Sequence, residues 1–184
     1  MNTVNVAYGM AHGNSGATPS LIILSGPPGT GKTTFARALC GTLAAVHIES
    51  DAIRRGLTPS PRYTPAENAA VFARAEAAGL RALTHGQHAI IDATNLTARD
   101  RRRFVHLARR LDCGLIFVRL TVPDGVARTR LASPREGFSQ ATAAIYDRMK
   151  GRYQPFSGPA VVVDTRYSIA PSLALVVAMI ASAG

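Results

Sequence analysis

A glycine-rich segment near the start of the chain has the residue types and spacing that bind phosphate. Residues 26–33 read GPPGTGKT and match the pattern G-x-x-x-x-G-K-[ST]. An apolar run at residues 21–24 precedes this segment, and a helix-forming stretch at residues 35–45 follows it. In such a strand–loop–helix setting, backbone N–H groups and the positive helix N-terminus converge on the phosphates of a nucleotide.

We therefore predict a nucleoside triphosphate site in this loop. The Lys32 ammonium would reach the β- and γ-phosphates, and the Thr33 hydroxyl would be a ligand of Mg²⁺. ATP and Mg²⁺ are accordingly the expected cofactors. The residues predicted to bind the nucleotide are Gly26, Pro27, Pro28, Gly29, Thr30, Gly31, Lys32, Thr33 and Thr34.

Carboxylates follow the next two apolar runs of the chain. Asp51 comes shortly after residues 46–48, and Asp92 directly follows residues 88–91. Phosphoryl transfer to an alcohol uses a carboxylate that orients the hydroxyl and takes its proton, and we predict this role for Asp51. Asp92 would hold Mg²⁺, directly or through water. The alternatives are that Ser50 or Asp51 is a helix N-cap and that Asp92 is purely structural.

Polar and cationic residues close to these carboxylates could contact the substrate. If a helix begins at Asp51, Arg54 and Arg55 lie near its carboxylate and would suit an acceptor that carries its own phosphate. The alternative is that both arginines are surface charges. Asn95, in the polar turn after Asp92, could touch either the substrate or the phosphate-binding loop.

Two further groups of arginines lie in the second half of the chain. Arg128, Arg130 and Arg135 surround a short stretch that contains a proline, as expected of a lid that brings positive charge to a transferring phosphoryl group. Arg130 and Arg135 are the predicted nucleotide-contacting members. The second group is interpreted as a solvated helix face, with substrate contact as the alternative: Arg99, Arg101, Arg102, Arg103, Arg109 and Arg110.

The elements that must position these residues alternate between strands and helices. Five apolar runs predict strands at residues 21–24, 46–48, 88–91, 115–120 and 160–163. Thr64 with Glu67 and Thr97 with Asp100 predict capping boxes at the starts of two helices, and Pro123 starts a short one. The apolar residues 173–181 predict a buried final helix, with an interface as the alternative. We expect a three-layer α/β P-loop kinase fold with a five-stranded parallel sheet and a small arginine-bearing lid.

Length and composition predict one domain. The chain has 184 residues; we expect residues 1–19 to be a flexible tail and residues 20–184 to form a single P-loop kinase domain. The tail lacks the apolar core of a secretory signal, and no apolar run approaches the ~20 residues that span a bilayer. A cytoplasmic protein without membrane contact is expected. Cys40 and Cys113 are interpreted as reduced packing residues.

The charge leaves two interpretations open. The formal net charge is +10, and only two of the 21 basic residues, Lys32 and Lys150, are lysines. Arginine binds phosphate bidentately, which favours a polyanionic substrate such as nucleic acid. A coding bias that places solvated arginines on the surface explains the composition equally well.

Taken together, the motifs resemble those of the phage-type polynucleotide 5′-kinase group of P-loop kinases. Relatives of that group include AAA_33-like predicted kinases, small-molecule kinases and zeta-toxin-like enzymes. The matching segments occur in the family's order and extend over residues 21–165: GPPGTGKTTFARAL, ESDAIRRGL, AIIDATNLTARDRRRF, the arginine-bearing residues 128–135, and VVVDT. The second and third of these segments are more specific than the phosphate-binding loop.

The resemblance implies roles for particular residues. Asp51 would be the general base toward a 5′-hydroxyl, and Arg54 would contact the adjacent phosphate of the acceptor. Asp92 would support this arrangement, and Arg135 or Arg130 would be the lid arginine on the ATP phosphates. The chain departs from the family at Thr129, where an asparagine is frequent, and at the Ser-Pro pair of residues 133–134.

Three functions are therefore compared. The first is an ATP- and Mg²⁺-dependent kinase that phosphorylates the 5′-hydroxyl end of a polynucleotide. The second keeps the reaction but uses a nucleoside, sugar, antibiotic or nucleotide-sugar, an acceptor that has less use for Arg54 and Arg55. The third is a nucleotide-binding switch without transfer, against which Asp51 argues because a switch needs no base for an acceptor.

Overall fold

The computed structural model describes residues 18–133, 138 and 141–182 of the chain. Residues 1–17 of the expected tail and the predicted lid residue Arg135 lie outside this part. The described residues contain a five-stranded sheet in the order β2-β3-β1-β4-β5, in which every pair is parallel. The strands are β1 Ser20–Ser25, β2 Ala45–Glu49, β3 His88–Asp92, β4 Gly114–Thr121 and β5 Val161–Asp164. The predicted parallel sheet is confirmed.

The central strand explains why the sheet must be covered on both faces. All six residues of β1, SLIILS, are buried, as expected of a parallel strand between two helical layers. Ile22 and Leu24 pack with Phe35 from the first helix and with Ile180 from the last, whereas Leu21 and Ile23 face the helices of the other side. The alternation of apolar side chains thus builds two cores from one strand.

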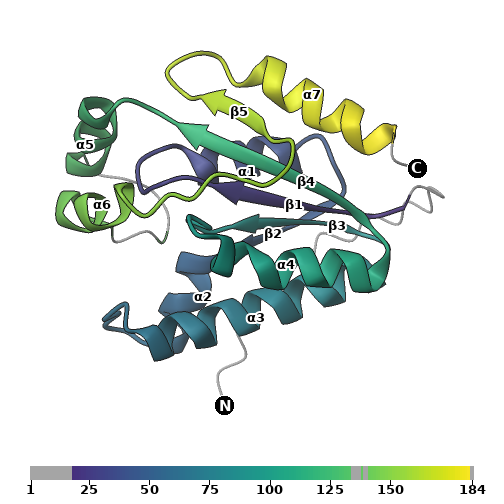
Figure 1. Cartoon of the computed structure of the whole chain (residues 1–184), viewed down its shortest axis with the longest axis horizontal. Helices are drawn as coiled ribbons and strands as arrows, with labels where there is room; N and C mark the ends of the chain where they lie inside the picture. Colours follow the sequence, from purple (N-terminus) through teal and green to yellow (C-terminus); the bar gives the residue numbers. More distant parts are fainter. Residues whose placement is uncertain (1–17, 134–137, 139–140, 183–184) are drawn as a thin grey trace.

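The helices form the outer layers of the sandwich (Figure 1). The first helix, α1 Lys32–Cys40, and the last, α7 Ala170–Ala181, cover one face of the sheet. The two long helices, α3 Pro65–Thr84 and α4 Ala98–Leu111, cover the other face. Two short helices lie beyond the carboxyl ends of the strands. The helices are α1 Lys32–Cys40, α2 Ser50–Leu57, α3 Pro65–Thr84, α4 Ala98–Leu111, α5 Asp124–Ala132, α6 Ala143–Lys150 and α7 Ala170–Ala181.

Three helices differ from the sequence expectations. The helix expected at residues 35–45 spans Lys32–Cys40, because Gly41 ends it and Ala45 already belongs to β2. The short helix α6 was not predicted. The expectation of a buried final helix was wrong in part: Val176 and Ile180 are buried, but Leu175 is 50% exposed.

Of the two predicted capping boxes, the one at α4 forms and the one at α3 forms only in part. At α4 the box is complete, with the side chains of Thr97 and Asp100 each accepting a backbone N–H of the other residue. At α3 the Thr64 side chain accepts the N–H of Glu67, but the Glu67 carboxylate accepts the N–H groups of Arg62 and Tyr63 instead. Glu67 therefore fastens the loop before α3 rather than the N-cap itself.

The interpretation of the α4 arginines as a solvated face was wrong for Arg101. This side chain is only 4% exposed and donates to the carbonyl oxygens of four residues: Asn95, Leu96, Gln154 and Pro155. Its guanidinium also lies 4.4 Å from the centroid of the Phe156 ring. Burial lowers the pKa of Arg101 from its ordinary value. Arg101 thus joins the turn after β3 to residues 154–155.

No helix in the described ranges is long and apolar enough to cross a membrane. Both cysteines are unpaired, as predicted.

Replacing Arg101 with alanine should lower the free energy of unfolding by about 3 kcal/mol, because several buried carbonyls lose a charged donor. Urea denaturation of the purified variant measures this loss. The neighbouring exposed Arg102 is the matched control, and its alanine variant should stay within about 0.5 kcal/mol of the wild type. Equal stabilities of the two variants would contradict the assigned role of Arg101.

Candidate active site

The carboxyl ends of the strands open into a cleft of about 560 Å³. This is the edge of a parallel sheet at which ligands bind in α/β proteins. The loop after β1, the start of α2 after β2 and the end of β3 all contribute to its wall. Predicted site residues that line the cleft are Pro28, Gly29, Gly31, Lys32, Thr33, Thr34, Asp51, Asp92 and Arg130.

The glycine-rich loop adopts a backbone that a phosphate group can enter. Gly29 and Gly31 have φ angles of 80° and 85°, in the left-handed region that favours glycine. A Cβ atom on Gly29 would lie 2.9 Å from the carbonyl oxygen of Ala127, so the loop also packs tightly on α5. No side chain caps the N-terminus of α1, and its first N–H groups can therefore bind an anion. These features fit the triphosphate of ATP.

Lys32 lies at the start of α1 and folds back over the loop. Its ammonium nitrogen donates to the carbonyl oxygen of Pro27 at 3.0 Å. Burial lowers the pKa of Lys32, whereas the nearby carboxylates of Asp92 and Asp51 favour the charged form. The arrangement places one cation between two acids in the cleft.

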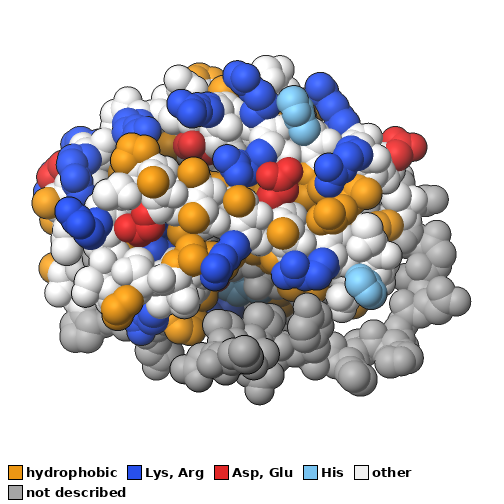
Figure 2. Space-filling model, turned by 90° about the horizontal axis from the view of Figure 1, so that it is seen from below, with side chains coloured by type: hydrophobic (Ala, Val, Ile, Leu, Met, Phe, Trp, Pro, Cys, Tyr) orange, Lys and Arg blue, Asp and Glu red, His pale blue; other side chains and the backbone are white. Residues whose placement is uncertain are grey.

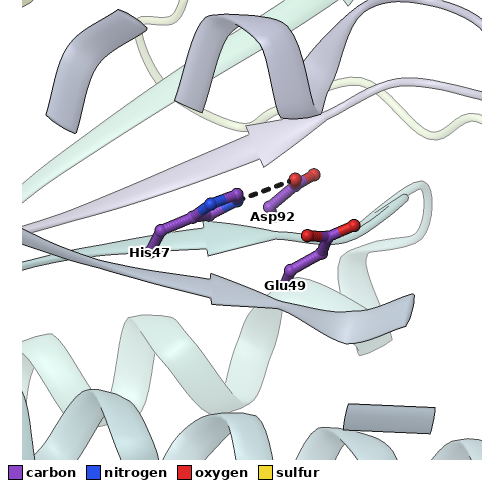
Figure 3. A group of neighbouring side chains, drawn as sticks. All are labelled: His47, Glu49 and Asp92. Carbon is purple, nitrogen blue, oxygen red and sulfur yellow. Dashed lines mark hydrogen bonds and ion pairs between the residues drawn. The ribbon is translucent and has the colours of Figure 1, made fainter. Parts of the chain in front are cut away.

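Asp92 is the centre of a polar cluster beneath the loop (Figure 3). Its carboxylate is buried and accepts the Thr33 hydroxyl at 2.8 Å, and His47 Nε2 lies 3.0 Å from the same Oδ2 atom. Glu49 points toward the same region, and the ligand atoms of His47, Glu49 and Asp92 all lie within 4.8 Å of one another. Hydroxyl and carboxylate oxygens are the ligands that Mg²⁺ prefers. The donor set at Thr33 and Asp92 therefore fits this cation.

His47 and Glu49 were not among the predicted site residues. They alternate along β2 and so share one face of the strand, and Glu49 is the register partner of Asp92 on the adjacent strand. Burial raises the pKa of the Glu49 carboxyl, and Asp92 adds to this shift. The signal that could have revealed both residues was their period-2 spacing, with His47 inside the predicted strand at residues 46–48 and Glu49 directly after it.

Asp51 lies in the first turn of α2 and lines the cleft. The helix begins at Ser50, as the sequence interpretation of Arg54 and Arg55 required. Tyr63 also lines the cleft, and its pKa is raised by burial and then by the charge of Asp51. A carboxylate is thus available at the rim where an acceptor would approach the loop.

Arg54 does not contribute to the cleft wall. Its guanidinium is buried, forms an ion pair with Glu67, donates to the Asn68 side chain at 2.8 Å and stacks over the Tyr63 ring. This arrangement does not fit the predicted contact between Arg54 and a phosphate of the acceptor, because its terminal nitrogens already have partners. Arg55 is exposed and lies over the ring of Phe138, which does line the cleft.

Arg130 connects α5 to the loop and to the end of β5. It donates to the Thr165 hydroxyl and carbonyl oxygens, each at 2.8 Å, and to the Gly29 carbonyl at 3.3 Å. Arg128 instead forms an exposed ion pair with Asp147. Of the two predicted lid arginines in the described part of the chain, Arg130 lines the cleft and Arg128 does not.

Asn95 supports the loop rather than facing a substrate. It is buried, with φ at 43°, and its amide donates to the Leu24 carbonyl at 2.8 Å. The Ser25 hydroxyl donates to the Asn95 carbonyl. Asn95 therefore ties the turn after β3 to the last residues of β1, directly before the glycine-rich loop.

Comparisons with known proteins found similar sequences and similar structures. The AAA_33 family model, an AAA domain, matches residues 21–156. An uncharacterized protein of Mycobacterium tuberculosis is 28% identical over 148 aligned residues, and the alignment covers 74% of this chain. The chain spans only 30% of the length of that relative.

Solved structures show the same fold. A provisionally named kinase from Chloroflexus aurantiacus aligns with a TM-score of 0.72 at 22% identity, covering 91% of this chain and 99% of that one. The APS kinase CysC of Mycobacterium tuberculosis, solved in complex with AMPPNP and APS, aligns with a TM-score of 0.69 at 15% identity. The alignment covers 89% of this chain and 98% of that kinase. The fold is that of P-loop kinases.

The pairing of Glu67 with Arg54 should make stability depend on pH in acid. The hydrogen bond from Arg54 lowers the pKa of Glu67 below its ordinary value of 4.5. A lowered pKa in the folded state adds stability above pH 4.5, and this part is lost as the pH falls through the folded-state pKa. The Glu67→Gln variant should therefore be less stable than wild type at pH 7, with the gap narrowing below pH 4.5.

Urea midpoints of both proteins between pH 3 and pH 7 test this expectation. The exposed Asp147, whose ion pair with Arg128 lies at the surface, provides the control variant Asp147→Asn. A gap between wild type and Glu67→Gln that stays constant across this range would refute the role of the Arg54–Glu67 pair.

Proposed function

Because the chain belongs to the AAA_33 family and has a P-loop kinase fold, we propose that it is an ATP- and Mg²⁺-dependent phosphotransferase. The acceptor in this proposal is a hydroxyl group, and the favoured acceptor is the 5′-hydroxyl end of a polynucleotide. The observation that carries the proposal is the shared cleft: the glycine-rich loop, Asp92 and Asp51 all line it.

The donor half of the site is supported by the loop and its surroundings. The uncapped N-terminus of α1 and the Lys32 ammonium would bind the β- and γ-phosphates. Thr33 and Asp92 would hold Mg²⁺, which neutralises phosphate charge when bound. Arg130 also lines the cleft, and its hydrogen bond to the carbonyl of Gly29 would fix the conformation of the loop.

The acceptor half depends on Asp51. In the proposed reaction the acceptor oxygen bonds to the γ-phosphorus while the bond from that phosphorus to the leaving ADP oxygen breaks. The hydroxyl proton passes to the Asp51 carboxylate, and the products are ADP and a phosphomonoester. Catalysis then consists of positioning and electrostatic stabilisation, without a covalent enzyme intermediate.

A small-molecule acceptor is the second candidate, and the placement of Arg54 favours it. Arg54, which was predicted to contact a phosphate of the acceptor, instead forms an ion pair with Glu67 and a hydrogen bond to Asn68. The structural neighbour CysC was solved with APS. A nucleotide switch without transfer is disfavoured, since Asp51 lines the cleft and a switch has no use for it.

Labelled ATP distinguishes these functions. The protein is incubated with [γ-³²P]ATP, Mg²⁺ and 5′-hydroxyl oligonucleotides of DNA or RNA, and in parallel with nucleosides, sugars and APS. The proposal expects label on the oligonucleotides. Label on a small molecule alone would replace the favoured acceptor with the second candidate, and release of inorganic phosphate alone would refute transfer.

The Asp51→Asn variant tests the proposed base. Transfer to the preferred acceptor should fall by about 10²-fold or more, because general-base catalysis contributes factors of this order. ATP affinity, measured by isothermal titration calorimetry, should change less than about threefold. The control is Asp112→Asn at the C-cap of α4, whose left-handed backbone suits asparagine; its activity should equal that of wild type. If the Asp51 variant loses ATP binding as well, the assignment of Asp51 as base is wrong.

A further inference from the structure

A second hollow lies outside the active-site cleft, between α4 and the segment of residues 154–157. This groove has a volume of about 340 Å³. Its lining is basic and aromatic, and no Asp or Glu is among the lining residues in the described part of the chain. The lining includes Arg102, His106 and Arg109 from α4, Phe117 from β4, and Phe156.

The cationic wall of the groove comes from one face of α4. Arg102, His106 and Arg109 follow one another at spacings of four and three residues, which places them on the same side of a helix. All three side chains are exposed. Neither Arg102 nor Arg109 forms an ion pair with a described residue, so both guanidinium groups are free for an anion. Figure 2 shows the face of α3 and α4, on which Lys and Arg side chains outnumber Asp and Glu.

The other wall is aromatic and held in place. The rings of Phe117 and Phe156 lie with centroids 4.5 Å apart and planes at 32°. Arg101 stacks on Phe156 and binds the carbonyl oxygens of Gln154 and Pro155, which fastens this segment to α4. Partly exposed aromatic side chains beside free arginines can bind single-stranded nucleic acid, through apolar contacts to bases and through phosphate contacts.

The groove begins close to the active-site cleft. Thr94 lines the cleft, and Ala98 lines the groove. Four peptide units separate these residues, so their Cα atoms are at most about 14 Å apart. At about 3.4 Å per nucleotide, the spacing along one strand of a duplex, this distance is at most about four nucleotides.

We propose that this groove binds a single-stranded nucleic acid, at nucleotides that follow the 5′-hydroxyl end held at Asp51. The position of the 5′ end at Asp51 rests on the proposed function, whereas binding of the strand to the groove depends only on the residues of the groove. It explains why part of the arginine surplus lies on α4, away from the site of transfer. It also predicts that binding increases with strand length.

Binding without chemistry provides the direct test. Oligodeoxythymidines of 2, 4, 8 and 16 nucleotides carry a 5′-phosphate, so that they cannot accept another phosphoryl group at that end. Affinities come from fluorescence anisotropy of a 3′-labelled 16-mer and from competition by the shorter strands. The double variant Arg102→Ala/Arg109→Ala is compared with Arg74→Ala/Arg81→Ala on α3, which removes two exposed arginines at the same spacing.

The proposal expects the α4 variant to bind the 16-mer about tenfold or more weakly than wild type, with little change for the dinucleotide. The slope of log affinity against log salt should decrease by about 1.4, since each single-strand phosphate contact contributes about 0.7. Phe156→Ala should weaken binding without changing this slope. Equal losses in the α4 and α3 variants, or no length dependence in the wild type, would overturn the proposal.

The outcome separates this inference from the proposed function. If only the α4 variant loses 16-mer binding, the proposed groove is supported. It remains supported even if no oligonucleotide is phosphorylated with labelled ATP, because that result would reject only the proposed acceptor. If dinucleotides with a 5′-hydroxyl are phosphorylated but the α4 variant binds the 16-mer like wild type, the groove is rejected and the acceptor stands.

Discussion

The hydrogen bond between the Thr33 hydroxyl and the Asp92 carboxylate is the contact on which the site depends. It joins the first turn of α1 to the end of β3. Its geometry follows from the pairing of β1 with β3, in which Leu24 lies opposite Asp92. Asn95 reinforces the same junction by binding the Leu24 carbonyl. A shift of register between these strands would separate the phosphate-binding loop from its acid, and the fold positions both groups before any ligand arrives.

The arginines fall into two groups: those that form internal hydrogen bonds, and those without an ion-pair partner among the described residues. This division bears on the two interpretations of the high net charge. Arg54, Arg101 and Arg130 each satisfy several oxygen atoms and thereby hold loops together around the cleft. Such residues are poor candidates for ligand contact, because each would have to give up internal hydrogen bonds. Arg102 and Arg109 have no such partners among the described residues. The net charge of +10 therefore does not show how many phosphate groups the protein can bind, because that number depends on where each guanidinium is placed.

The sequence predicted the strands and the loop well because their signals are local. A short apolar run, a glycine pattern and an acid at the end of a run each depend on few neighbouring residues, and all five strands formed where expected. The roles of Arg54 and Arg101 depended on partners 13 and 53 residues away, Glu67 and Gln154, and no local pattern reveals such pairs. His47 likewise gained its role only when β2 paired with β3. Helix ends were missed where one glycine, Gly41, outweighed the helix-forming residues around it.

The central claim is that the cleft moves the γ-phosphate of ATP to a hydroxyl. Phosphorus-31 NMR follows every phosphate in one sample of protein, Mg–ATP and a 5′-hydroxyl oligonucleotide. The γ-phosphate resonance of ATP should decline while a phosphomonoester resonance, coupled to the 5′-methylene protons, grows in equal amount. Growth of inorganic phosphate alone, or unchanged ATP in the presence of this acceptor and the small-molecule acceptors, would contradict it.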